Sequence, residues 1–303
     1  MKSSIVLLLT AAFIYIQISA ASSSEGGNTA SQDVYTFDVE TPANLEVQLA
    51  GGQIQVQSHD RNEIRVEKYL EGRAAEDHNL NIEVNKVGNT VFVKVENENR
   101  TFNWFSGRNP KISFKIFVPA ETSGNLQTSG GSIAIQGING DTEMRTSGGS
   151  LSINRVIGHV TARTSGGPIT VGQTEGVLSA RTSGGPIKIS GFTGELDCRT
   201  SGGSISLTDV NGKIAGRTSG GSITANNLNY IDSLDLRTSG GNVSVTIPDK
   251  LNLDLDLRGS RVRTNLNNFS GTSERNKVEG KVNGGGIPIS LRTSGGVIDL
   301  KYE

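Results

Sequence analysis

The sequence predicts an all-β fold: a single-stranded parallel β-helix, or β-solenoid, with coils of about 18 residues and a β-rich N-terminal cap. Three observations predict it. The string TSGG occurs eight times, apolar and polar residues alternate between the repeats, and 39 of the 303 residues are glycine, well above the roughly 7% of an average protein. A repeat this short cannot bury an apolar face alone, so neighbouring repeats must stack.

Each repeat is predicted to hold two short strands and two corners. Apolar residues stand two and four positions after the Gly-Gly pair, as Ile187 and Ile189 do, and a second pair precedes the next TSGG, as Leu196 and Cys198 do. A spacing of two is that of a strand with one buried side. TSGG forms one corner, and a glycine at a fixed position forms the other, because glycine reaches positive φ without a Cβ penalty.

The spacing of the repeats sets the expected stack. The first five intervals are 18 residues, the sixth is 20 and the last is 55, which we interpret as close to three further turns. The repeats begin at Thr128, Thr146, Thr164, Thr182, Thr200, Thr218, Thr238 and Thr293.

The first 33 residues are predicted to lie outside the folded part. Lys2 precedes an apolar run at 5–16, and small residues follow it at Ser19, Ala20 and Ala21, so residues 1–21 are predicted to be a secretory signal peptide. The run is too short to span a bilayer comfortably; the alternative is an uncleaved anchor. Residues 22–33 are predicted to be a flexible leader. We expect a mature chain without a transmembrane segment, exported to the periplasm, the cell surface or the medium.

The rest of the chain divides into two predicted parts. Residues 34–120 alternate apolar and polar residues in segments bounded by turn residues, which predicts a β-rich cap and early coils, because a solenoid needs its open ends covered. Residues 121–303 are predicted to be the TSGG-repeat solenoid. Within it, residues 265–276 have the composition of an inserted loop, and residues 293–303 restore the repeat.

The export signal, the β-patterned lead and the tandem (R)TSGG(S/P)I coils together resemble the putative-adhesin family of unknown function. Members of that family are similar to the β-helical head domains of auto-transporter-type adhesins, and the resemblance covers roughly residues 34–303. It implies a right-handed parallel β-helix at a bacterial envelope or surface. It brings no catalytic residues with it.

An arginine column is the first candidate binding site. Seven of the eight repeats follow an arginine, and alternation directs these side chains outward. Such a column can bind an anionic polysaccharide or a lipid head group through bidentate contacts. The alternative is that each arginine pairs with a nearby acid such as Glu143, Asp197 or Asp235. The candidate residues are Arg145, Arg163, Arg181, Arg199, Arg217 and Arg237, and Arg292 precedes the last repeat.

Two further features are candidates. Phe102, Trp104 and Phe105 form an aromatic-dense segment that can stack on sugars or enter a membrane, the alternative being a plug for the end of the core. The backbone N–H groups of the TSGG corners can form an anion-binding nest, the alternative being that they serve only the turn.

The composition excludes several function classes. The 29 Lys+Arg against 30 Asp+Glu argue against a nucleic-acid partner, and the single cysteine argues against a disulfide framework or a multi-cysteine zinc module. The three scattered histidines give no metal or acid–base spacing. We expect no catalytic residues, no metal and no cofactor.

The sequence thus predicts a non-enzymatic binding or structural module of the cell envelope or surface, an adhesin whose partner is an envelope glycan or a surface protein. Two alternatives stay open. One is a carbohydrate-active enzyme on the same scaffold, which requires carboxylates gathered in a groove. The other is an envelope scaffold protein that pairs with its partner through an end strand.

Overall fold

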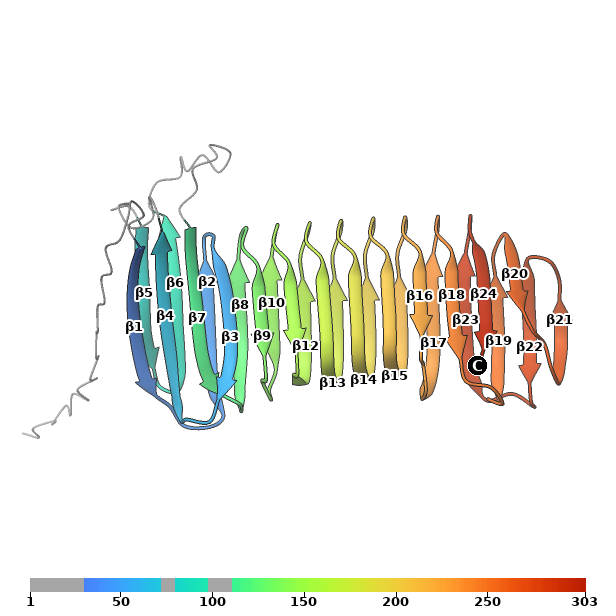
Figure 1. Ribbon diagram of the computed structural model, residues 1–303, viewed down its shortest axis with the longest axis horizontal. Coiled ribbons are helices and arrows are strands. Elements are labelled where there is room, and N and C mark those ends of the chain that lie inside the picture. The colour runs from blue at the N-terminus through green and yellow to red at the C-terminus, as the bar shows by residue number, and fades with distance from the viewer. Residues whose placement is uncertain (1–29, 72–79, 98–110) are drawn as a thin grey trace, which may run out of the picture.

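The computed structural model describes residues 30–71, 80–97 and 111–303. The regular structure of these residues is entirely β, with 24 strands in one continuous hydrogen-bonded sheet. The sheet winds into a parallel β-helix whose coils stack along the long axis of the molecule (Figure 1). The predicted fold class is confirmed. Among the described residues there is no helix long and apolar enough to cross a membrane.

The strands form two rows whose apolar sides face each other. Strands β13, β14 and β15 belong to both rows, because each runs through the bend between them. In stacking order the first row is β1 (Ala30–Asp38), β4 (Glu63–Glu71), β7 (Lys111–Pro119), β3 (Gln53–His59), β9 (Ile133–Gln136), β11 (Leu151–Asn154), β13 (Ile169–Arg181), β14 (Ile187–Arg199), β15 (Ile205–Arg217), β16 (Ile223–Asn226), β18 (Val243–Ile247), β24 (Val297–Tyr302) and β20 (Arg261–Thr264). The second row is β5 (Leu80–Val87), β6 (Thr90–Asn97), β2 (Ala43–Leu49), β8 (Thr122–Thr128), β10 (Thr142–Thr146), β12 (Ile157–Arg163), β13, β14, β15, β17 (Ile231–Thr238), β23 (Ile287–Thr293), β19 (Leu253–Arg258), β22 (Lys277–Val282) and β21 (Phe269–Ser273).

The core consists of columns of like residues. Ile169, Ile187 and Ile205 lie in register on successive coils, and each is at most 1% exposed. Burying such a side chain stabilises the fold by about 1.5–3 kcal/mol, and each coil buries several side chains of this kind. Thr174 interrupts one apolar column, and its buried hydroxyl donates a hydrogen bond to the Gly172 carbonyl at 2.9 Å. The predicted pair of strands is confirmed in the repeats that hold β9 and β10, β11 and β12, and β16 and β17. In β13, β14 and β15 the two predicted strands are instead one 13-residue strand that runs through the bend.

The TSGG corners are held by a repeated hydrogen-bond pattern. The Thr200 hydroxyl donates to the Gly185 carbonyl of the preceding coil at 2.9 Å and accepts from the Gly203 N–H at 3.2 Å. The N–H groups of Ser201 and Gly202 both donate to the serine carbonyl of the preceding coil. All three N–H groups that a nest would use already have partners, so this corner is a structural turn, as the second interpretation predicts.

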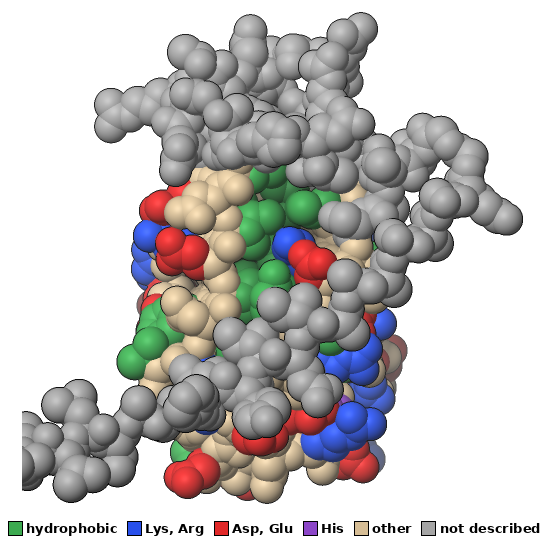
Figure 2. Space-filling model, turned by 90° about the vertical axis from the view of Figure 1, so that its left-hand side faces the viewer, with side chains coloured by type: hydrophobic (Ala, Val, Ile, Leu, Met, Phe, Trp, Pro, Cys, Tyr) green, Lys and Arg blue, Asp and Glu red, His purple; other side chains and the backbone are tan. Residues whose placement is uncertain are grey.

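The stacking order at the N-terminal end differs from the chain order. The coil β2–β3 lies directly against β8–β9, and the later coil β6–β7 lies outside it, so that the blue strands in Figure 1 sit between green ones. Strands β4, β5 and β1 then close this end in antiparallel pairing. Figure 2 views this end, where hydrophobic side chains fill the space between the two rows.

The C-terminal end is interleaved in the same way. Strands β23 and β24, the last of the chain, lie between β17–β18 and β19–β20. Thr293 therefore lies beside Thr238, and the 55-residue interval is one step of the stack; our expectation of three further turns is wrong. The predicted loop at 265–276 is also partly wrong, because it contains β21, which pairs antiparallel with β22 and extends the second row.

The predicted leader needs one correction. Residues 30–33 belong to β1, where Asp33 forms an ion pair with Lys68 and Gln32 donates a hydrogen bond to the Tyr69 hydroxyl at 3.2 Å. These polar contacts and the pairing with β4 order a segment that has few apolar side chains. The predicted signal peptide, the rest of the leader, and Phe102, Trp104 and Phe105 lie outside the described residues.

Candidate binding face

The register of the second row stacks the arginines side by side. The six candidates occupy one outward position on successive coils, and the same position continues through Arg292, Arg258 and Lys277. Neighbouring strands are about 4.8 Å apart, so these residues form a continuous row of cations. We call Arg145, Arg163, Arg181, Arg199, Arg217, Arg237, Arg292 and Arg258 the arginine ladder. The sequence pattern missed Arg258, because no TSGG follows it; the corner there is Gly259-Ser260.

Aspartates on every second coil hold the arginines in pairs. Asp197 accepts a hydrogen bond from Arg199 Nε at 3.0 Å, within its own strand, and one from Arg181 Nη2 at 3.1 Å, on the coil before. The same arrangement recurs twice: Asp235 with Arg237 and Arg217, and Asp256 with Arg258 and Arg292. Three carboxylates thus clamp six guanidinium groups.

The clamping carboxylates are stabilised in their charged form. Burial alone would raise the pKa of Asp197, but the hydrogen bonds from Arg199 and Arg181 outweigh it and hold the pKa below its ordinary value. The pKa of Asp256 is lowered by the same balance of burial against two arginines. Because each ionised aspartate faces two arginines, the Asp197 and Asp235 clamps each carry a net charge of +1 over two coils, or about 9.6 Å. In the Asp256 clamp, Arg258 Nη2 also donates a hydrogen bond to Glu279 at 3.4 Å, and Glu279 pairs with Lys277.

The pairing pattern is different at the start of the ladder. Glu143 lies on the same strand as Arg145 and accepts a hydrogen bond from its Nε at 2.7 Å. The corresponding position beside Arg163 is Thr161. Within the described part of the chain, the Arg163 side chain has neither a hydrogen bond nor an ion pair, whereas the side chains of the other candidate arginines each have an acidic partner. The pairing with Glu143, Asp197 and Asp235 considered from the sequence is therefore present, and it leaves an excess of positive charge.

The opposite face of the same coils is almost uncharged. We call the outer side of the first row between β9 and β18 the neutral face, and its only charged side chain at the two outward strand positions is Lys188. These positions are Ala134, Gln136, Ser152, Asn154, Thr170, Gly172, Lys188, Ser190, Ser206, Thr208, Thr224, Asn226, Ser244 and Thr246. The matching positions of the second row carry nine charged side chains.

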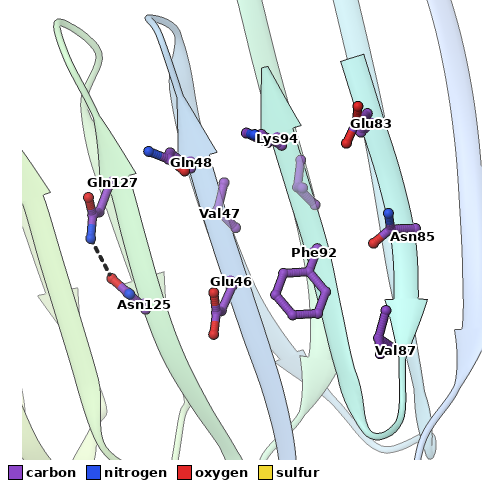
Figure 3. A pocket seen from close by; sticks show the side chains of 11 residues that line it. Glu46, Val47, Gln48, Glu83, Asn85, Val87, Phe92, Lys94, Asn125 and Gln127 are labelled. Carbon is purple, nitrogen blue, oxygen red and sulfur yellow. Dashed lines mark hydrogen bonds between the residues drawn. The ribbon is translucent and has the colours of Figure 1, made fainter. Parts of the chain in front are cut away.

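A groove of about 390 Å³ lies beyond the N-terminal end of the ladder (Figure 3). It crosses β8, β2, β6 and β5 on the outer side of the second row, with Phe92 at its centre. The ladder position continues into it as Gln127, Gln48 and Lys94. The sequence pattern did not predict this groove. Its signal is the run Val91-Phe92-Val93, in which an outward position is aromatic.

Cys198, His59 and His159 are engaged in local contacts. Burial raises the pKa of the Cys198 thiol to about 12, so the thiol stays protonated in the core. His59 Nε2 lies 2.8 Å from the Glu63 carbonyl oxygen, and His159 Nδ1 lies 4.0 Å from Asp141. Within the described ranges, no three His, Cys, Asp or Glu side chains are grouped so that they could hold a metal ion.

Three solved structures illustrate what the chain resembles. A "putative adhesin" from Bacteroides fragilis is 14% identical, with a TM-score of 0.45 over 90% of this chain and 97% of that one. A "putative lipid binding protein" from Parabacteroides distasonis is 15% identical, with a TM-score of 0.49 over 89% and 97%. A "putative adhesin" from the same organism is 13% identical, with a TM-score of 0.34 over 91% and 98%. At this similarity they do not bear on the ligand.

A family match covers most of the fold. No curated protein matched the sequence in a search. Residues 43–301, from β2 to β24, match the family described as Toastrack DUF4097, which takes in the stacked coils, the arginine ladder and the Phe92 groove. The chain belongs to the Toastrack DUF4097 family.

Proposed function

We propose that this protein is an exported, non-enzymatic binding module of the bacterial envelope or surface, an adhesin whose arginine ladder binds an anionic surface polysaccharide. The observation that carries the proposal is the sharing of three aspartates by six arginines, which leaves a regular row of net positive charge. The predicted signal peptide and the resemblance of the coils to auto-transporter-type adhesin heads support the location.

The ladder has hydrogen-bond donors to spare. A guanidinium group carries five N–H donors in a planar fork, and each clamp uses one nitrogen of each arginine. Arg181 is bound through Nη2 and its Nε is buried, whereas Arg199 is bound through Nε. Arg181 Nη1 and both terminal nitrogens of Arg199 are therefore free to meet a carboxylate or sulfate of a ligand, and Arg199 can do so in bidentate fashion. A side chain already held by its clamp loses little further entropy on binding.

The spacing of the charge favours a polysaccharide over a nucleic acid. The clamps give one net charge in about 9.6 Å, whereas a single nucleic-acid strand carries one in about 3.4 Å. A polymer with one carboxylate on every second sugar matches this density better. The straight row also suits an extended chain, while a lipid head group would engage only one clamp.

The placement of the groove carboxylates supports a binding role over hydrolysis. Glu46 pairs in register with Phe92, and Glu83 pairs with Lys94 on the other side of β6. Two strand spacings and two residues along the strand separate their Cα atoms by about 12 Å, and Figure 3 shows the two side chains on opposite sides of β6. Glycosidases instead hold a matched pair of carboxyl groups on either side of one scissile bond.

The test is a binding measurement with hyaluronan, a polymer that carries a carboxylate on every second sugar, and with uncharged dextran. We expect the mature protein to bind hyaluronan more weakly as salt rises and not to bind dextran through the ladder. The variant Arg163→Gln/Arg181→Gln/Arg199→Gln should bind hyaluronan at least about tenfold more weakly, since each bidentate contact contributes about 1.5–3 kcal/mol.

The matched control removes three positive charges from the opposite side: Lys188→Gln, Arg263→Gln and Lys301→Gln, all at outward positions of the first row. It should bind hyaluronan as the wild type does. Unchanged binding by the ladder variant, or an equal loss in the control, contradicts the proposal.

A further inference from the structure

Phe92 occupies an outward position of β6, where packing of the core does not require an aromatic ring. Its neighbours Val91 and Val93 point inward and are at most 1% exposed, while Phe92 points outward from β6 and keeps part of its ring accessible. Val87, on the adjacent β5, is 66% exposed at the edge of the same groove. Together they form a small apolar platform on an otherwise polar surface (Figure 3).

Polar groups without partners surround this platform. Glu46 lies beside Phe92 on β2, and Asn85 lies beside it on β5. Within the described residues, the side chains of Glu46, Asn85 and Gln48 make no hydrogen bond or ion pair, so their donors and acceptors are free. The groove thus offers one carboxylate and two amides on the strands that flank an aromatic ring.

This combination suits a sugar ring. A pyranose has a face of C–H groups that packs on an aromatic ring and an edge of hydroxyl groups that need both donors and acceptors. The groove volume of about 390 Å³ lies within the range of small-ligand sites, roughly 300–1,000 Å³. The platform of one phenylalanine and one valine is too small for a protein partner, which buries about 800 Å² on each side of a stable interface.

The charge of the groove selects against acidic sugars. Glu46 and Glu83 are both acidic, and Lys94 is already paired with Glu96 at 2.7 Å. The groove is therefore net negative, the opposite of the ladder. We infer that the groove around Phe92 is a second binding site, distinct from the ladder, that takes a neutral pyranose stacked on the Phe92 ring with its hydroxyls on Glu46, Asn85 and Gln48.

The test titrates the mature protein with four neutral hexasaccharides (maltohexaose, cellohexaose, mannohexaose and chitohexaose), using saturation-transfer NMR and calorimetry. We expect at least one to bind and Phe92→Ala to weaken that binding about tenfold, the loss of one stacking contact and its buried area. Phe92→Tyr should bind as the wild type does, since it keeps the ring. Phe92→Leu should lose binding although it keeps the apolar bulk, which separates stacking from a folding defect.

Two control variants test whether the hexasaccharide binds at the Phe92 groove. Tyr230→Ala removes another exposed aromatic, 66% accessible and far along the stack, and should leave binding unchanged. The ladder variant should also bind the neutral hexasaccharide as the wild type does, so failure of the ladder proposal and failure of this one are distinguishable. The inference is overturned if no hexasaccharide binds, if Phe92→Leu binds as tightly as the wild type, or if Tyr230→Ala loses as much as Phe92→Ala.

Discussion

The two outer faces of the repeat coils share one backbone and differ in almost every exposed side chain. The neutral face has hydroxyls, amides and a single Lys188, whereas the second row has a column of arginines beside a column in which acids are interspersed with uncharged residues. Both rows have two mostly apolar inward columns, and both follow the same 18-residue interval from Thr128 to Thr218. The inward residues and the corners therefore determine the coil, and they leave the outward positions of both rows free to carry different chemistry.

The comparison also shows how electrostatic repulsion within a row of like charges destabilises the fold. Adjacent guanidinium groups one strand apart repel by about 1 kcal/mol or less in water, and a run of eight would accumulate that repulsion. An aspartate shared by two arginines offsets it locally without neutralising the row. The neutral face needs no such device, and none of its outward positions between β9 and β18 carries an acid.

The largest expected effect comes from a corner on which both faces depend. A Cβ at Gly203 would overlap the Gly185 carbonyl of the preceding coil, while a Cβ at Gly202 would have its nearest neighbour 3.6 Å away. We expect Gly203→Ala to lower the free energy of unfolding by about 2–4 kcal/mol and Gly202→Ala to change it by less than about 1 kcal/mol. Urea unfolding measures both. Equal losses in the two variants would mean that the corner does not set the coil spacing.

A smaller effect is expected in how the free energy of unfolding depends on pH, which the aspartates of the second row influence and the neutral face does not. Because the pKa values of Asp197 and Asp256 are lowered in the folded state, their contribution is present above about pH 4 and is lost as the pH falls through the folded values. The variant Asp197→Asn/Asp235→Asn/Asp256→Asn should be about 1–2 kcal/mol less stable at pH 7. That difference should shrink towards pH 3.

The control for this variant replaces three exposed acids that have no ion pair in the described structure: Asp60→Asn, Glu175→Gln and Asp232→Asn. It should follow the wild-type pH profile of unfolding free energy. A clamp variant whose deficit stays constant down to pH 3 would show that the aspartates contribute through packing and not through charge.

The smallest effect is expected at the unclamped arginine. Arg163→Ala should change the free energy of unfolding by less than about 0.3 kcal/mol, as should Lys188→Ala on the neutral face, because neither removes an ion pair with an acid. Arg181→Ala opens the Asp197 clamp and should cost about 0.5 kcal/mol. Thermal unfolding at low salt measures the stability losses of the three variants and so ranks them. A loss at Arg163 equal to that at Arg181 would contradict the assignment of the clamps.

The sequence predicted the parts of the molecule that repeat. The alternation around Ile187 and Ile189 identified the inward columns, and Arg199 was correctly placed on the outer side. The stacking order at the ends could not be predicted, because a 55-residue interval does not say which coil Thr293 adjoins. The clamps could not be predicted either, because they depend on the register between coils. Asp197 lies on β14 and accepts a hydrogen bond from Arg181 on the neighbouring strand β13. The Phe92 groove joins strands that are far apart in the sequence.

The most direct test of the central claim is an arginine footprint. Phenylglyoxal modification of the mature protein, followed residue by residue by mass spectrometry, should slow several-fold at the ladder arginines when hyaluronan is added. Arg155, Arg261 and Arg263, which lie off the ladder, should react at the same rate with and without the polymer. Equal protection of both sets, or no protection of Arg163, Arg181 and Arg199, would contradict the proposal that the ladder is the binding surface.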